Sequence, residues 1–542
     1  MVAGQSYKKR LPPSAIPAIN KLAVLKPKDK LSRITGKTLT VESPIRTYGQ
    51  SEVLVEAGVA VGTMPLTVPG RMLLSLPVEY ANAVVTPRDG TWNVLDKKFR
   101  TAMEMPRWAV ACFAPSMSMD DIVRTMRELA QCCAKLGMVF GHPDPQRSFV
   151  QGSGQNVRRK LYDICGENNK NSVDMIFVIL PGNAADIRRE VKYLGDVELG
   201  VRTQCLLVDK LPRPGDRNAS QYYNNVALKL NTRLGGCNAT VGGPILTGLK
   251  SDPFMIVGAD VSHPSPGSSR PSVASLLWSH NKYATAYGCI RRLQPSRQEI
   301  IQDLEAMFVH ALDSFLQGNA LKRENGHIYL PPKRIFFYRD GVSEGQFAIV
   351  KDFEIAAVKA AIAQVWNQRG FNGRPFPLLT FLIVGKRHHV TFFPDGHYEI
   401  VEDRKTGNCK PGLVVDDALA NPQYKDFYLL SHAAILGTSR CAHYTVLLDE
   451  NFQEDVAKLE ELSYALCHAY ARATRSVSIP APVYYADLAC DHAKFHMDPN
   501  AMFDLESDAS STTGSVADAS LEEWNKAFHD VHKNLAHTMY FL

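Results

Sequence analysis

Three aspartates have the chemistry and the setting to hold metal ions. Asp260, Asp340 and Asp487 each follow an apolar stretch, at a strand end or where an expected strand meets a helix. Carboxylate oxygens on such rigid edges are hard ligands of the kind that Mg²⁺ and Mn²⁺ prefer. Two ions about 4 Å apart can activate a water and stabilise the leaving oxygen of a phosphodiester. Each aspartate taken alone is equally compatible with ordinary turn chemistry.

Glu299 is open to a structural interpretation as well. The run Ser296-Arg-Gln-Glu299 has the spacing of a capping box, in which the two side chains satisfy free amides at the start of a helix. By spacing alone, Glu299 is therefore a capping residue at the beginning of a long helix.

Basic side chains recur at helical spacing in the first half of the chain. Arg188 with Lys192, and Lys229 with Arg233, are each four residues apart, and Gln204 lies between the two pairs. Such a group can clamp a terminal phosphate through charge-assisted hydrogen bonds, although a solvated helix face has the same pattern. Cations in the second half that could follow a nucleic-acid backbone are Lys386, Arg387, His432, Arg440, Arg472 and Arg475.

Composition narrows the class of protein without deciding it. The chain has 542 residues and a net charge of +6, but residues 1–50 alone hold ten Lys/Arg and two Asp/Glu. A nucleic-acid site must therefore be a local basic channel.

The eleven cysteines include no CxxC pair, which favours a reducing compartment. Cys490, His492 and His496 form the nearest approach to a metal motif, and no second half-site accompanies them. A membrane span and a signal peptide are not expected.

The elements that must position these residues alternate between strands and helices. A strand is expected at 108–115, followed by a helix with Ser118 as N-cap and Gly137 as its stop. Another strand at 174–182 precedes a helix reaching Tyr193, and a further helix covers 220–234. This order predicts a doubly wound α/β module over about 107–250.

A second block follows from residue 253, and its early hairpins followed by strand–helix alternation suggest a mixed sheet. The expected strands are 253–264, 273–278, 283–290, 334–341, 378–393, 443–450 and 483–489. The expected helices start at Ser296 and cover about 345–367 and 456–473. Residues 1–50, basic and rich in proline, are expected to be a linker or the remnant of something larger, and residues 504–523 a solvated mobile loop.

Several long motifs together resemble the C-terminal half of Argonaute proteins. They are GADVSHP at 258–264, YRDGVSEGQF at 338–347, KRHH at 386–389, SHAAILGTSR at 431–440, TRSVSIPAPVYYADL at 474–488 and TMYFL at 538–542. The resemblance runs from about Trp92 to Leu542. It implies a PAZ remnant and linker at 1–106, a Rossmann-like MID domain at 107–250 and a PIWI domain of RNase H fold at 251–542.

The resemblance also assigns roles to residues. Asp260, Glu299, Asp340 and Asp487 match the catalytic tetrad, with Asp260, Asp340 and Asp487 as ligands of Mg²⁺ or Mn²⁺ and Glu299 completing the site after guide binding. The guide 5′-phosphate set is Arg188, Lys192, Gln204, Lys229, Arg233 and Leu542. The guide-backbone set is Lys386, Arg387, His432, Arg440, Arg472, Arg475, Ser478 and Tyr484. Arg188 stands where the family usually has a tyrosine that stacks on the first guide base, and His492 where PIWI usually lends an arginine, with Lys494 as a substitute cation.

The implied activity is that of a small-RNA-guided endoribonuclease of RNA silencing, which cleaves paired target RNA by two-metal hydrolysis. The implied partners are a small guide RNA, a complementary target RNA and silencing-complex proteins, and the implied location is the cytoplasm, with the nucleus as a second place. A silencing protein that binds guides and recruits partners without cutting is the alternative.

Overall fold

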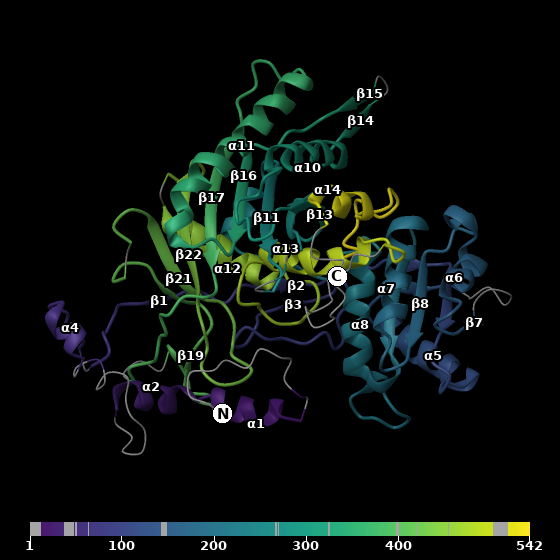
Figure 1. Ribbon diagram of the computed structural model, residues 1–542, viewed down its shortest axis with the longest axis horizontal. Helices are drawn as coiled ribbons and strands as arrows, with labels where there is room; N and C mark the ends of the chain where they lie inside the picture. The colour runs from purple at the N-terminus through teal and green to yellow at the C-terminus, as the bar shows by residue number, and fades with distance from the viewer. Residues whose placement is uncertain are drawn as a thin grey trace.

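The computed structural model describes residues 12, 14–36, 48, 51–62, 64–141, 149–265, 268, 270–323, 326–396, 400–419, 421–453, 455–501 and 519–542. Two α/β modules lie side by side, with the N-terminal helices below them in the view of Figure 1. The larger module is built on a nine-stranded sheet and the smaller one on a four-stranded sheet.

The smaller module is a parallel sheet covered on both faces. Its strands β5 (Trp108–Cys112), β7 (Phe149–Gln151), β8 (Met175–Leu180) and β9 (Arg202–Leu207) run in the order β7-β5-β8-β9. The uninterrupted burial of β8 is what a strand between two helical layers requires. Helices α5 (Met119–Lys135) and α8 (Ala219–Arg233) pack on one face, and α6 (Val157–Cys165) and α7 (Ala185–Tyr193) on the other. The predicted doubly wound arrangement is confirmed.

Local sequence signals set the ends of these helices. The Ser118 hydroxyl accepts the Asp121 N–H at 3.1 Å, which caps α5 as predicted. Gly137 follows the helix with φ 94°, a left-handed conformation that glycine adopts at low cost. Helix α7 continues into a π-helical turn at Leu194–Glu198.

The larger module has a mixed sheet in the order β1-β20-β21-β22-β17-β16-β11-β12-β13. Its central strands β11 (Phe254–Ser262), β16 (Arg334–Asp340) and β17 (Leu378–Gly385) are parallel, and the flanking pairs are antiparallel. The flanking strands are β1 (Arg71–Met72), β12 (Ser272–Ser279), β13 (Tyr287–Gln294), β20 (Leu413–Val415), β21 (Lys425–Leu430) and β22 (Ala442–Asp449). Helices α10 (Leu304–Gly318) and α11 (Phe347–Gln368) cover one face, and α9 (Pro244–Leu249), α12 (Val456–His468) and α13 (Ala481–His492) the other.

Four expectations for this module are wrong. The segment 483–489 belongs to helix α13 and not to a strand. The prediction failed because a short, mostly apolar run has no periodicity that distinguishes a helix from a strand. No helix begins at Ser296, and α10 starts at Leu304. Arg297 has φ 62° and donates its N–H to Ser272 Oγ at 2.9 Å, so the chain turns at this point. The expected strand 378–393 ends at Gly385, and the helix expected to reach 473 ends at His468.

The N-terminal region contains helices where a linker was expected. These are α1 (Ile16–Ala23), α2 (Pro27–Thr35) and α4 (Glu52–Glu56). Most of the loop expected at 504–523 lies outside the described residues, and α14 (Leu521–Ala527) begins within its last part. Small strands β2 (Val78–Glu79), β3 (Val84–Val85) and β10 (Thr240–Val241) form a separate sheet in the order β10-β2-β3. The remaining strands are β4 (Glu104–Met105), β6 (Val139–Phe140), β14 (Leu321–Arg323), β15 (Gly326–Ile328), β18 (Glu402–Asp403) and β19 (Asn408–Cys409). None of the helices in the described ranges is both long and apolar enough to span a bilayer.

Candidate active site and phosphate site

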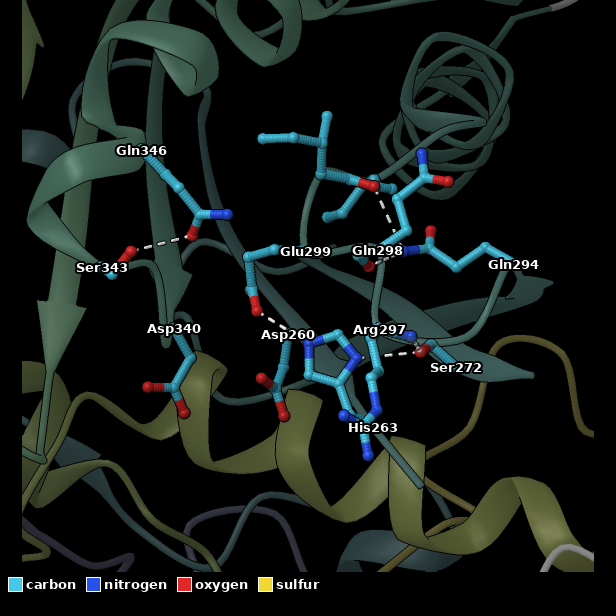
Figure 2. Close-up of polar contacts among 12 residues, drawn as sticks. Asp260, His263, Ser272, Gln294, Arg297, Gln298, Glu299, Asp340, Ser343 and Gln346 are labelled. Atoms are coloured by element: carbon cyan, nitrogen blue, oxygen red, sulfur yellow. Dashed lines mark hydrogen bonds and ion pairs between the residues drawn. The ribbon is translucent and has the colours of Figure 1, made fainter. Parts of the chain in front are cut away.

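The sheet and one helix bring the three aspartates together. Strands β11 and β16 are parallel neighbours, and their last paired residues are Ala259 and Arg339. Asp260 and Asp340 are the next residues on the two strands, so they lie side by side. Figure 2 shows both carboxylates directed toward the same side of the sheet edge. Asp487 comes from α13, which packs on β11, and its charge acts on both of the other carboxylates. Gly258 permits this approach, since a Cβ there would lie 2.3 Å from the Pro482 carbonyl oxygen.

Burial and mutual repulsion dominate the electrostatics of this acidic cluster. Asp260 and Asp340 are buried, and Asp487 is half-buried. Burial, followed by the charges of Asp340 and Asp487, raises the pKa of Asp260 to about 7. Burial also raises the pKa of Asp340, against the opposing effect of Lys386, whose Nζ lies 3.0 Å from Asp340 Oδ2. A cation at this edge therefore favours the charged forms of these carboxylates.

Glu299 lies on a turn and is linked to strand β16 through Arg339. Arg339 Nη2 donates to Glu299 Oε1 at 3.1 Å, and Arg339 Nη1 donates to the main-chain oxygen of Asp340 at 2.6 Å. One guanidinium therefore connects Glu299 to the residue that ends β16. The Glu299 carboxylate also contacts His263 Nε2 at 2.8 Å, as the dashed line in Figure 2 shows.

The proton assignment of His263 follows from its neighbours. Ser272 Oγ lies 2.8 Å from His263 Nδ1 and also accepts the Arg297 N–H. Because that hydroxyl still has its own proton to donate to Nδ1, Nε2–H remains to donate to Glu299. His263 and Arg339 together hold the glutamate in its present orientation.

The basic residues of the smaller module also converge. Lys192 and Arg233 are buried and both donate to the Thr203 carbonyl oxygen, at 3.0 and 3.1 Å, while Arg233 Nη1 donates to Gln204 Oε1 at 2.7 Å. Burial and then the charge of Arg233 lower the pKa of Lys229 to about 8. Arg188 is exposed and its guanidinium lies over the Phe495 ring, 5.2 Å from the centroid.

This concentration of positive charge is poised for an anion. Arg472, which was assigned to the guide backbone, acts on Lys229 and Arg233 and so belongs electrostatically to the same cluster. Burial lowers the pKa of Arg233 to about 10, and neighbouring cations contribute. A bound phosphate would relieve both the repulsion and the unpaired Arg233 Nε, which is buried without a hydrogen-bond partner.

His492 connects the two modules and is not a cation at neutral pH. Its Nε2 lies 2.7 Å from Asp196 Oδ2, and burial lowers its pKa to about 4. The Asp196 pKa is about 2, because Lys192 and the His492 hydrogen bond outweigh the effect of burial. His492 therefore supports Asp196 instead of supplying the positive charge that an arginine would. Lys494 lies over the Phe495 ring at 5.3 Å.

The side-chain ligand atoms of Asp196, His492 and His496 all lie within 4.8 Å of one another, which is close enough to hold a metal ion. Cys490 is not part of this group, and its thiol donates to the Asp260 and Val273 carbonyl oxygens. The charge around the triad argues against a metal. Arg291 Nη2 lies 2.9 Å from His496 Nε2, and Lys192 faces Asp196. Cations in these positions disfavour a further cation, so we interpret the triad as a hydrogen-bonded contact between the modules.

The remaining predicted residues divide among several environments. Lys386 contacts Asp340 and so belongs to the acidic cluster, while Arg387 and Arg440 are exposed. Arg475 Nη2 donates to the Ala433 carbonyl oxygen at 2.6 Å, and its charge, after burial, lowers the pKa of the adjacent His432 to about 4. Ser478 is half-buried, and the rings of Tyr484 and Tyr470 are 4.8 Å apart. Leu542 is buried in the core beneath α12 and α13, two residues after Tyr540, whose ring contacts His492.

Four residues that position the site were not singled out from the sequence: His263, Arg339, Glu354 and Asp196. Arg339 carries a usable signal, since a lone arginine inside the apolar strand FFYRD must find a buried partner. That partner is Glu354 on α11, at 3.2 Å from Arg339 Nε. Its position on a helix fifteen residues away could not be paired with Arg339 without the tertiary structure.

An RNase H-like sheet with clustered acids, joined to a doubly wound module with clustered cations, defines a lobe of MID–PIWI type. The Piwi domain family matches residues 175–498, and the Mid domain of argonaute matches residues 86–165. The chain belongs to the Argonaute family. The Piwi match begins inside the region predicted as MID, so the boundary near 250 stays a prediction.

Relatives and solved structures agree with this assignment. Protein argonaute 5 of Arabidopsis thaliana is 36% identical over 94% of this chain, and protein argonaute 10 of the same plant 34% identical over 93%. The chain spans about half the length of these curated relatives, 51% of each. A Kluyveromyces polysporus Argonaute with a guide RNA has a TM-score of 0.79 at 23% identity, over 100% of this chain and 60% of its own. The C-terminal lobe of a budding yeast Argonaute has a TM-score of 0.72 at 26% identity, over 88% of this chain and 95% of its own.

Proposed function

We propose that this chain is the MID–PIWI part of a small-RNA-guided endoribonuclease. The observation that carries the proposal is the meeting of Asp260, Asp340 and Asp487 at one sheet edge, where burial and repulsion raise the pKa of Asp260 to about 7. Natural proteins keep such a costly arrangement mainly at functional sites.

The proposed cleavage site fits divalent ions. Three carboxylates that repel one another make a donor set of hard oxygens, opposed by the charges of Arg339 and of Lys386, whose Nζ lies 3.0 Å from Asp340 Oδ2. Asp260, Asp340 and Asp487 would hold Mg²⁺ or Mn²⁺. Such ions, when bound, lower the pKa of a water and stabilise charge on the scissile phosphate.

The chain's own residues prepare this chemistry. Arg339 anchors the turn that carries Glu299, so the glutamate can leave His263 and approach the aspartates without losing its tether. Lys386 opposes the rise in the pKa of Asp340 that burial causes. The Arg188, Lys192, Gln204, Lys229 and Arg233 cluster would hold the guide's 5′ phosphate, and Arg472 adds to its charge.

A cleavage assay tests the proposal. Protein loaded with a 5′-phosphorylated guide RNA is given a labelled complementary target in Mg²⁺ or in EDTA. We expect one Mg²⁺-dependent cut at a fixed distance from the guide's 5′ end, and none with Asp340→Asn.

The non-cleaving alternative predicts a different result. The chain would then bind the guide with the same dependence on the 5′ phosphate while the target stayed intact in every metal. Asp340→Asn serves as the matched control, because it removes the charge and keeps the shape of the side chain.

A further inference from the structure

Helix α7 carries cations at two depths. Lys192 is buried and donates to the Thr203 carbonyl oxygen, whereas Arg188, one turn earlier in the same helix, is exposed. At 1.5 Å of rise per residue the two positions are about 6 Å apart along the helix axis. The charge of Arg188 still acts on Lys192, so both belong to one electrostatic cluster. This face of the helix therefore has an inner cation and an outer cation.

The inner cations account for one phosphate. Lys192 and Arg233 donate to the same carbonyl oxygen, at 3.0 and 3.1 Å, and Arg233 Nε is buried without a hydrogen-bond partner. A phosphate that accepts the hydrogen of this Nε and approaches Lys192 lies in the buried part of the site, one helical turn from Arg188. Arg188 is then level with the next group along the ligand, and not with the terminal phosphate itself.

The Phe495 ring positions the Arg188 guanidinium. The ring is buried, and the guanidinium carbon lies 5.2 Å from its centroid. The ammonium of Lys494 lies 5.3 Å from the centroid of the same ring. A guanidinium that stacks on an aromatic ring uses one flat face, and its N–H groups stay directed outward around the edge, where they can bind two oxygens of a phosphate at once. This arrangement suits a further phosphate better than a neutral nucleoside.

The charge balance of the cluster also favours a ligand with more than one phosphate. Five cations act on one another here, and the carboxylate that opposes them is Asp196. The five are Lys192, Lys229, Arg233, Arg472 and Arg188. A single terminal phosphate carries only about −1.5 to −2 at pH 7. Positive charge is therefore left over when one phosphate is bound, and its exposed part is at Arg188.

We propose that the 5′ site accepts guide RNAs that end in a triphosphate, with the terminal phosphate at Lys192 and Arg233 and a further phosphate at Arg188. The proposal rests on the function proposed above, because it names the substrate class of the same 5′ site. A monophosphorylated guide would fill only the inner part of this site.

Three forms of one RNA sequence, which differ only at the 5′ end, test the proposal. Binding of the 5′-hydroxyl, 5′-monophosphate and 5′-triphosphate forms is measured for the wild type and for Arg188→Gln, which removes the charge. We expect the wild type to bind the triphosphate about tenfold more tightly than the monophosphate, the factor that one charge-assisted hydrogen bond supplies. Arg188→Gln should bind these two forms with nearly equal affinity, because its loss falls on the triphosphate.

Arg217→Gln is the matched control for net charge. Arg217 is exposed and precedes α8, whereas Arg233 ends that helix, so the two lie roughly 24 Å apart along its axis. The control removes the same charge from the same module and should keep the wild-type preference for the triphosphate. An equal loss of this preference in Arg217→Gln would indicate general charge attraction and would overturn the proposal.

Arg188→Tyr separates a phosphate contact from base stacking. A tyrosine ring can stack on the first base but carries no positive charge, so this variant should also lose the preference for the triphosphate. If Arg188→Tyr keeps the preference, or if Arg188→Gln weakens binding of the monophosphate and triphosphate forms equally, Arg188 does not bind a further phosphate and the proposal is wrong.

The 5′-hydroxyl form keeps the two proposals distinguishable. If the wild type binds the hydroxyl and phosphorylated forms equally, the proposed function itself fails. If it discriminates against the hydroxyl but binds the triphosphate no more tightly than the monophosphate, only the inference about triphosphate ends fails. Thermal unfolding of the Arg188 variants at the wild-type temperature confirms that the exposed substitutions have not disturbed the fold.

Discussion

Replacing Arg339 by methionine tests whether one buried guanidinium organises the candidate active site. Arg339 and Glu354 are fully buried, and Nε to Oε2 is 3.2 Å. Arg339 also donates to the Glu299 carboxylate and to the Asp340 carbonyl oxygen. Removing one member of a buried ion pair leaves the other charge without compensation, which costs about 3–5 kcal/mol. At about 2–4 °C per kcal/mol for a large domain, Tm should fall by roughly 10 °C.

Arg369→Met is the matched control in the same domain. Arg369 contacts Asp313 Oδ1 through Nε at 3.0 Å and through Nη2 at 2.7 Å, but these two side chains are 29% and 30% exposed. A solvated pair of this kind contributes about 0–1 kcal/mol. The assay is thermal unfolding of the two variants and the wild type, followed by target cleavage below both melting temperatures.

Adding Glu354→Gln to Arg339→Met isolates the pair. The amide can still accept the Ile301 N–H, which now bonds Glu354 Oε1 at 3.0 Å, but it carries no charge. The double variant should therefore recover part of the lost Tm while cleavage stays impaired, because Glu299 has lost its anchor. If Arg339→Met costs no more stability than Arg369→Met, the reasoning from buried charge is wrong.

Three further predictions concern other parts of the chain. Gly258→Ala should lower Tm and reduce cleavage, because its Cβ would displace α13 from β11, whereas Gly345→Ala, with open space around it, should change neither; unfolding and cleavage assays decide. Lys229→Gln should weaken binding of a 5′-phosphorylated guide by about 1.5–3 kcal/mol, roughly 10- to 100-fold, and leave a 5′-hydroxyl guide nearly unaffected; equal loss for both guides would contradict a phosphate contact. Burial lowers the pKa values of His280, His432, His468 and His492 to about 4 from 6.5, so the stability that these neutral histidines contribute is complete above pH 6.5 and is lost as pH falls toward 4. The free energy of unfolding should fall across this range by up to about 1.4 kcal/mol per pH unit for each histidine, and Tm should fall with it. A flat profile of Tm against pH would show that they are not buried in solution.

Local sequence signals predicted the elements that depend on near neighbours. Ser118 and Gly137 mark the two ends of α5, and the apolar run at 175–180 could only be a buried element. The motif order also sufficed to relate the chain to the Argonaute family. Such features are encoded within a few residues, so no distant contact is needed to specify them.

Where distant segments meet, the local sequence pattern predicts the wrong element or none. Glu299 has the spacing of a capping residue, yet Ser272 Oγ accepts the Arg297 N–H and Arg339 donates to the Glu299 carboxylate. The segment that carries Asp487 is a helix that packs on β11 and the core, and its own apolar pattern cannot reveal this packing.

The amino-acid sequence by itself determined the family, the doubly wound module and the chemistry of the acidic and basic residues. The tertiary structure decided that Lys386 serves the acidic cluster, that Arg472 joins the phosphate cluster and that α2 lies beside Arg440. Charge interactions depend on distance and on burial, and both are fixed only when segments hundreds of residues apart are packed together.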